Sequence, residues 1–181
     1  MHLRLSPCIG MPVVEEGTED FLGSLSGVLI DPDVGRIEGM YVQIPGFFSQ
    51  RELFCASQDI LRFGTRVTVR SADAVCPQEE FIRLESLFRD PRTVLGQRIR
   101  TESGSYIGRC SDIQFETGGM RLEWIFPRRS FRWGLALPVS DIIEVKTDAI
   151  VVRDSAALEK EIEAEPAADE QTSVQSVPET A

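Results

Sequence analysis

The stretch from Phe126 to Trp133 carries the residue types that could do the most specific chemistry in this chain. It reads Phe-Pro-Arg-Arg-Ser-Phe-Arg-Trp, with three arginines set among three aromatic side chains. Arginine and tryptophan are enriched where protein interfaces concentrate their binding energy, and an arginine beside an aromatic ring can also stack on a base or hold a phosphate. The sequence therefore predicts a partner-binding surface made by five of these residues: Arg128, Arg129, Phe131, Arg132 and Trp133.

A second aromatic segment lies earlier in the chain and reads Pro45-Gly46-Phe47-Phe48-Ser49-Gln50-Arg51. Two exposed phenylalanines in a loop would form an apolar patch of the kind that binds other proteins. Phe47 and Phe48 therefore join the predicted partner-binding surface. The alternative for both segments is that their aromatic rings cover the cores of their own halves or pack the two halves together.

The other candidates for chemistry are weak. His2 is the only histidine, so a Ser-His or Cys-His pair is not expected. Asp31-Pro32-Asp33 begins like a calcium loop, but the later acidic ligands of such a loop are missing. The four cysteines contain no Cys-x-x-Cys pair, and we expect reduced, mostly buried thiols. We predict no catalytic site, no metal site and no cofactor, and hence a protein that is not an enzyme.

The net charge of −10 is unevenly placed along the chain. Residues 155–181 contain seven acids and one lysine, which gives −6 and leaves −4 for residues 1–154. An acidic body disfavours non-specific binding to nucleic acid, because phosphate contacts need positive charge. No segment approaches the roughly 20 apolar residues of a membrane span, and the first residues lack the apolar core of a signal peptide. We therefore expect a cytoplasmic protein.

Two strands joined by a tight turn, between Gly23 and Val42, organise the rest of the chain. The turn Asp31-Pro32-Asp33-Val34-Gly35 has the aspartates, proline and glycine that such turns require. A weaker copy of this hairpin returns about 85 residues later. The matched positions are Gly10 with Gly96, Val13 with Ile99, Gly23 with Gly108, Ile30 with Phe115, Ile37 with Leu122, Ile60 with Ile142 and Val67 with Ala149. This pattern predicts two tandem copies of one small β unit.

The predicted organisation has four parts. The first β unit covers residues 9–75 and the second covers residues 95–154. Residues 76–94 form a helical connector, because Phe81, Leu84 and Phe88 fall on one helical face. Residues 155–181 have almost no large apolar side chains, so we expect a disordered acidic tail. Its charge also suggests that it could compete for the arginines at 128–132.

These motifs resemble the PRC-barrel family. The first unit carries the turn Ile30-Asp31-Pro32-Asp33-Val34-Gly35-Arg36-Ile37, and the second carries the later step Leu137-Pro138-Val139-Ser140-Asp141-Ile142. The family includes the cytoplasmic domain of the photosynthetic reaction-centre H subunit and the C-terminal domain of a ribosome maturation factor. The resemblance implies an all-β protein of two tandem small PRC-type β-barrels, joined by a short helix.

The resemblance also sets the functional expectation. Family members are mostly adaptors, which implies a non-enzymatic adaptor or assembly factor that binds a protein partner in a photosynthetic, respiratory or ribosomal complex. Two alternatives stay open. One is a ribosome- or RNA-associated maturation factor whose arginines contact phosphate, and the other is a small-molecule-binding module with a site between the barrels. The oligomeric state is left open.

Overall fold

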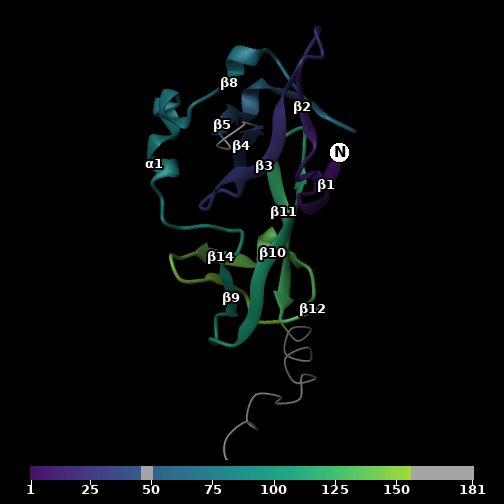
Figure 1. The fold of residues 1–181 in the computed structure, drawn as a ribbon. Coiled ribbons are helices and arrows are strands. Elements are labelled where there is room, and N and C mark those ends of the chain that lie inside the picture. Colours follow the sequence, from purple (N-terminus) through teal and green to yellow (C-terminus); the bar gives the residue numbers. More distant parts are fainter. Residues whose placement is uncertain (46–50, 156–181) are drawn as a thin grey trace, which may run out of the picture.

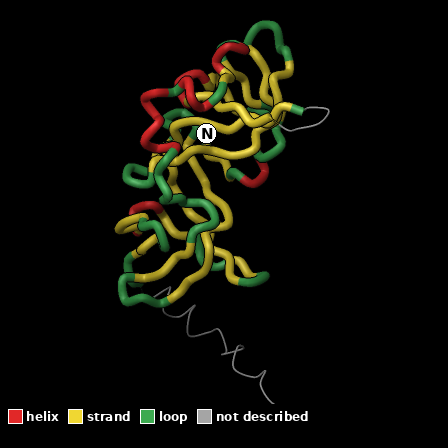
Figure 2. The backbone as a smooth tube through the Cα atoms, turned by 60° about the vertical axis from the view of Figure 1, so that its left-hand side comes forward, coloured by secondary structure: helices red, strands yellow, loops and turns green. Residues whose placement is uncertain are grey.

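The computed structural model describes residues 1–45 and 51–155, and all of their strands belong to one sheet (Figure 1). The predicted contact residues Phe47 and Phe48 and the predicted acidic tail beyond Ser155 lie outside the described residues. The molecule is elongated (Figure 2), with the earlier strands of the sequence at one end and the later strands at the other (Figure 1).

The first half contains seven strands around one long hairpin. Their bounds are Pro12–Glu15 (β2), Phe21–Asp31 (β3), Arg36–Ile44 (β4), Arg51–Ala56 (β5), Ile60–Phe63 (β6), Val67–Val69 (β7) and Val75–Cys76 (β8). They lie in the order β6-β7-β2-β3-β4-β5-β8, and the β2–β7 pair is parallel. Strand β4 pairs with β3 on one side and with β5 on the other, and its apolar residues Ile37, Met40 and Val42 are fully buried.

The second half repeats this arrangement. Its strands are Arg98–Thr101 (β9), Tyr106–Glu116 (β10), Arg121–Arg129 (β11), Arg132–Trp133 (β12), Leu137–Pro138 (β13), Ile142–Val145 (β14) and Ile150–Val152 (β15). The order is β14-β15-β9-β10-β11, the β9–β15 pair is parallel, and the short β12 and β13 both pair with β11.

The strand registers of the two halves agree at most of the matched positions. Val13 lies opposite Gly23 and Ile99 lies opposite Gly108. In the same way Ile30 lies opposite Ile37, and Phe115 lies opposite Leu122. These pairs are the ones that the matched sequence positions predict.

The predicted match of the last strand is wrong by one residue. Val67 pairs with Val13, and the residue that pairs with Ile99 is Ile150 rather than Ala149. The register of these short strands is set by parallel pairing with a strand about 50 residues away, so the local pattern does not determine it.

The two halves meet through the turns of their long hairpins, where β4 pairs with β11. The Ile37 amide donates to the Met120 carbonyl, and the Leu122 amide donates to the Gly35 carbonyl, both at 2.8 Å. Since Ile37 and Leu122 are matched positions, the two bonds are reciprocal. The rings of Phe63 and Phe115, one from each half, also meet edge to face at 5.6 Å.

An additional strand, His2–Arg4 (β1), precedes the first half but pairs with β10 of the second. A 3-10 turn at Ser6–Cys8 follows it and leads the chain back to β2. The sequence predicts the first strand at Ile9–Val14, so β1 is not anticipated. Further 3-10 turns lie at Ser57–Asp59, Ala72–Ala74 and Val139–Asp141.

The connector is less helical than predicted. It contains 3-10 turns at Gln78–Glu80 and Ile82–Leu84 and one short helix, Glu85–Phe88 (α1). The backbone of Phe81 leaves the helical region, with φ −92° and ψ 66°. This bend brings two aromatic rings of the connector edge to face against Phe54 of the first half, each at 5.0 Å between centroids.

The prediction of an all-β architecture is confirmed, with α1 as the only α-helix among the described residues. One apolar core cluster includes residues of both halves, such as Leu25, Ile37, Ile99 and Ile113. The main path of paired strands ends at β14 and β6, a branch from β4 through β5 ends at β8, and the sheet is not closed. The two tandem PRC-type barrels therefore stay a prediction. Within residues 1–45 and 51–155, no helix has the length and apolar character needed to cross a membrane.

Candidate binding surface

The predicted arginine–aromatic stretch forms the free end of a hairpin. Phe126 to Arg129 continue β11, and β12 runs back beside it, so that Arg128 lies opposite Trp133 and Arg129 opposite Arg132. Ser130 turns the chain with a positive φ of 50°, which is uncommon for a residue other than glycine. We call residues 128–133 the hairpin tip.

The apolar side chains of the hairpin tip are presented to solvent rather than to the core. Phe131 is 91% exposed and Trp133 is 52% exposed. Arg128 and Arg132 are exposed as well, while Arg129 is half-buried. The five predicted residues of the second half therefore lie together, and neither phenylalanine nor tryptophan serves to cover a core.

Arginine side chains hold the aromatic rings at the base of the hairpin tip. The Arg4 guanidinium lies 4.1 Å from the centroid of the Phe126 ring and 5.2 Å from that of Trp133. The Arg128 guanidinium lies 5.5 Å from the Trp133 ring. Contacts of this kind orient a ring without burying it, so Trp133 keeps about half of its surface for another molecule.

Arg4 is itself anchored by a buried carboxylate, Asp112 of β10, which is 1% exposed. Arg4 donates to Asp112 Oδ2 from Nε at 2.9 Å and from Nη2 at 2.8 Å. Ser6 donates from its amide at 2.9 Å and from its hydroxyl at 2.6 Å, and the Ile113 amide donates at 2.9 Å. A buried charge needs such partners. Asp112 therefore fixes the N-terminal segment against the second half.

Three exposed arginines stand in a row across the neighbouring strands. On β9 and β10 Arg98 lies opposite Arg109, and on β10 and β11 Arg109 lies opposite Arg128. Residues directly opposite on antiparallel strands share one face of the sheet, and like charges in such positions destabilise it. We call Arg98, Arg109 and Arg128 the arginine row; it ends at Trp133, the partner of Arg128.

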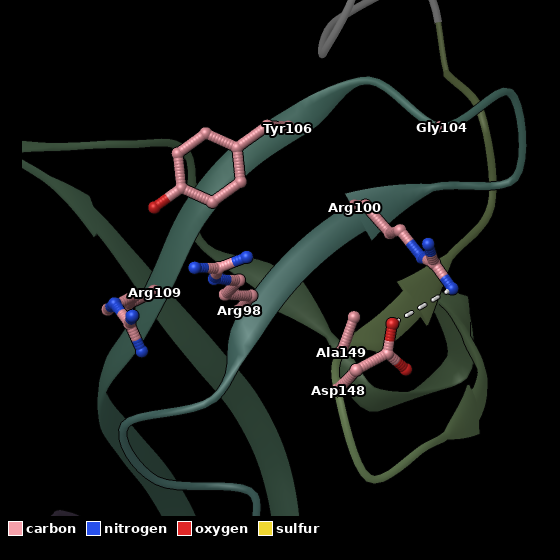
Figure 3. A pocket seen from close by; sticks show the side chains of 7 residues that line it. All are labelled: Arg98, Arg100, Gly104, Tyr106, Arg109, Asp148 and Ala149. Atoms are coloured by element: carbon pink, nitrogen blue, oxygen red, sulfur yellow. Dashed lines mark ion pairs between the residues drawn. The ribbon is translucent and has the colours of Figure 1, made fainter.

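A shallow pocket of about 460 Å³ lies beside the arginine row (Figure 3). Its lining residues are Arg98, Arg100, Gly104, Tyr106, Arg109, Asp148 and Ala149. Arg100 forms an ion pair with Asp148 at 3.6 Å. Arg109 is steadied by one hydrogen bond from Nη1 to the Gly96 carbonyl at 2.9 Å. Figure 3 shows the Tyr106 hydroxyl and the side chains of Arg98 and Arg109 on the side of the pocket away from Arg100.

These pocket residues and Asp112 are not among the predicted site residues. A signal for two of them is visible in Arg98-Ile99-Arg100-Thr101, where charged residues alternate with residues that become buried. That alternation predicts two arginines on one exposed face of a strand. Arg109 and Asp112 give no such signal, because only the strand register shows what they face.

Thiol, histidine and metal chemistry has little support among the described residues. Burial raises the pKa of the Cys55 and Cys110 thiols to about 12, and it also raises the pKa of Cys8 and Cys76. All four cysteines are free and three are buried, as predicted. His2 contacts Glu123 at 2.7 Å on the surface. Residues 1–45 and 51–155 contain no group of three or more His, Cys, Asp or Glu side chains that could hold a metal ion.

No protein-family model matches this chain, and no curated protein matches it either.

Proposed function

We propose that this chain is a non-enzymatic adaptor that binds a protein partner through the hairpin tip and the rings beside it. The observation that carries the proposal is the exposure of Phe131 and Trp133, at 91% and 52%, at the end of one hairpin. Large aromatic side chains that leave the core and are flanked by arginines have the composition of an interface centre.

The support of Trp133 from below adds to this proposal. A ring that is already oriented by Arg4 and Arg128 loses less conformational entropy on binding than a free side chain does. Asp112 in turn fixes Arg4, so the surface around Trp133 is already ordered before a partner binds. A surface prepared in this way suits a rigid partner.

The resemblance to the PRC-barrel family extends the proposal to an assembly factor. On this view each half is a PRC-type barrel unit, and the partner belongs to a larger photosynthetic, respiratory or ribosomal complex. The matched hairpins and the reciprocal turn contacts support a duplicated unit. A cytoplasmic location agrees with this role and is part of the same proposal.

The test is capture of the partner by the immobilised full chain from the cytosol of the source cells. Wild type is compared with Phe131→Ala and Trp133→Ala, and with Phe21→Ala as the matched control. Phe21 is 55% exposed on β3 of the other half, so it offers a similar ring away from the hairpin tip. We expect both tip variants to lose the partner at moderate salt and the control to retain it.

A fold check accompanies the capture experiment. Because Phe131 is almost fully exposed, Phe131→Ala should change the free energy of unfolding by no more than about 0.5 kcal/mol. Trp133→Ala also removes the ring contacts with Arg4 and Arg128 and should cost about 1–2 kcal/mol. Equal capture by wild type and Trp133→Ala would refute the proposed role of the hairpin tip.

The arginine row favours a second candidate, an RNA-associated factor. Three exposed arginines opposite one another could follow a phosphate backbone. Binding of a single-stranded RNA should then weaken with salt at a slope of about −2 on a double logarithmic plot, since each contacted phosphate contributes about −0.7. A protein partner held by aromatic contacts should show a much smaller slope, which separates the two candidates.

A further inference from the structure

The pocket beside the arginine row is lined by residues that do not belong to the hairpin tip. We propose that it binds a phosphate monoester, carried by a phosphorylated side chain of the same protein partner. This inference rests on the proposed function only for the carrier of the phosphate, since the pocket itself can be tested with a small molecule.

The charge of the lining fits a dianion. Three arginines and one aspartate line the pocket, which leaves a net charge of +2. A phosphate monoester carries about −1.5 to −2 at pH 7, whereas a carboxylate carries only −1. Asp148 already offsets Arg100 through their ion pair at 3.6 Å. The charges of Arg98 and Arg109 remain for a ligand.

The donors of the pocket also fit phosphate. A phosphate group presents three oxygens that accept strong hydrogen bonds, and a guanidinium offers a planar fork that matches two of them. Within the described part of the chain, the Arg98 side chain has no hydrogen bond or ion pair, and Arg109 uses one donor on the Gly96 carbonyl. In Figure 3 the Tyr106 hydroxyl lies on the same side as these two arginines and supplies another donor.

The arginine row lowers the stability of the sheet unless a negative group neutralises its positive charge. Like charges on directly opposite residues of a sheet destabilise the pair. The chain has a net charge of −10 and 29 acidic residues, yet none of the residues opposite the arginine row in β9, β10 or β11 is acidic. A bound dianion would remove this repulsion, as expected of a surface that is completed by its ligand.

The pocket continues directly into the hairpin tip. Arg109 of the pocket lies opposite Arg128 of the tip, and the Arg129 guanidinium lies 5.6 Å from the ring centroid of Tyr106. A partner that covers Trp133 would therefore also cover the mouth of the pocket. This continuity identifies the phosphate carrier as the protein that binds the tip.

Phenyl phosphate is the first probe, titrated into the full chain and followed by NMR or calorimetry at constant ionic strength. Wild type is compared with Arg98→Gln/Arg109→Gln and with Arg62→Gln/Arg70→Gln as the matched control. Arg62 and Arg70 are exposed, at 70% and 62% of their side-chain surface, and lie in the first half. We expect saturable binding that the pocket variant weakens at least roughly tenfold and the control leaves within about twofold.

Two further readouts identify the chemistry of the ligand. Benzoate has a similar ring with a single charge and should bind at least roughly tenfold more weakly than phenyl phosphate. Lowering the pH from 7.5 to 5.0 should also weaken phenyl phosphate binding, because the second pKa of a phosphate monoester is about 6. Equal binding of benzoate, equal losses in both double variants, or binding that does not saturate would overturn the proposed pocket.

The carrier is tested with a phosphoserine peptide, its unphosphorylated form and a single-stranded RNA of similar length. We expect only the phosphopeptide to bind with the same dependence on Arg98 and Arg109. Preferential binding of the RNA through these arginines would overturn the assignment to a protein partner. Absence of phenyl phosphate binding by wild type, with intact Trp133-dependent capture, would refute the pocket alone. Intact phenyl phosphate binding, together with partner capture that does not depend on Trp133, would refute the proposed function.

Discussion

Replacing Asp112 with alanine tests whether the N-terminal segment supports the hairpin tip. Asp112 is 1% exposed and accepts hydrogen bonds from Arg4, Ser6 and Ile113. Removal of the carboxylate leaves these donors without their acceptor. We expect a decrease in the free energy of unfolding. We also expect the environment of the Trp133 ring to change, because the Arg4 side chain contacts both the Asp112 carboxylate and the ring.

The size of the loss follows from which donors can reach water. Ser6 is exposed and the Arg4 side chain is 39% exposed, so both can exchange Asp112 for water. The Ile113 amide belongs to a fully buried residue, and an unsatisfied buried donor costs about 1–3 kcal/mol. Release of the β1 segment adds about 1 kcal/mol, the value of one ordinary hydrogen bond. The expected total is therefore about 2–4 kcal/mol.

Urea unfolding measures this loss, with Glu16→Ala as the matched control. Glu16 also pairs with an arginine, Arg62, at 3.6 Å, but both side chains are more than half exposed. Its removal should cost no more than about 0.5 kcal/mol. In a Trp124→Phe background, Trp133 is the only tryptophan, and its native-state emission should shift in Asp112→Ala and in Arg4→Met.

Two results would refute this reasoning. A cost below about 1 kcal/mol for Asp112→Ala would show that the carboxylate is not an anchor of the N-terminal segment. The expected loss of stability of about 2–4 kcal/mol, together with an unchanged Trp133 emission, would show that Asp112 stabilises the fold without ordering the hairpin tip.

Two further predictions concern the fold and its dependence on pH. Gly39→Ala should destabilise the protein by about 2–4 kcal/mol in urea unfolding, because an added Cβ would lie 2.2 Å from Phe54 Cζ. The control is Gly27→Ala, whose added Cβ would have its nearest atom at 3.5 Å and which should change stability by no more than about 1 kcal/mol. Equal effects of the two substitutions would contradict the close packing at Gly39. Arg92→Gln should reduce stability at pH 7, because hydrogen bonds from Arg92 lower the pKa of Asp33 and of Asp90. The stability that a lowered aspartate pKa provides is present above the ordinary value of 3.8 and disappears as the pH falls through the lowered pKa values. The difference in stability between wild type and Arg92→Gln should therefore shrink below about pH 4. An undiminished difference in stability at pH 3 would contradict this prediction.

Local patterns predicted the long hairpins and their repetition well. The turn at Asp31 to Gly35 is a property of neighbouring residues, and it brings Ile30 opposite Ile37, although two bulges shift the register further along β3 and β4. A glycine inside a strand, such as Gly39 of β4, is typical of a bulge or a close backbone approach, and the nearness of Phe54 to Gly39 agrees with the close approach. The arginine–aromatic stretch at 126–133 was found because its residue types stand together in the chain.

Features that depend on distant pairing were not predictable in this way. The strand β1 has three residues, too few for a periodic pattern, and its partner β10 begins more than 100 residues later. The arginine row joins residues 98, 109 and 128, which only the strand registers bring together. The matched position of Asp112 in the first half is Gly27, so the repeat itself gives no reason to expect a buried carboxylate there.

The pairing of β1 with β10 also determines when the protein can complete its fold during synthesis. The hydrogen bonds between the N-terminal segment and Asp112 span 106 and 108 residues of chain. At about 5–20 residues per second, this segment waits roughly 5–20 seconds after its own synthesis before its partner strand exists. The first half can form its own strand pairs during that time, while the second half reaches its final form only by recruiting the oldest part of the chain. Assembly of the arginine and aromatic surface is therefore a late event, so a nascent or truncated chain would not yet present it to a partner.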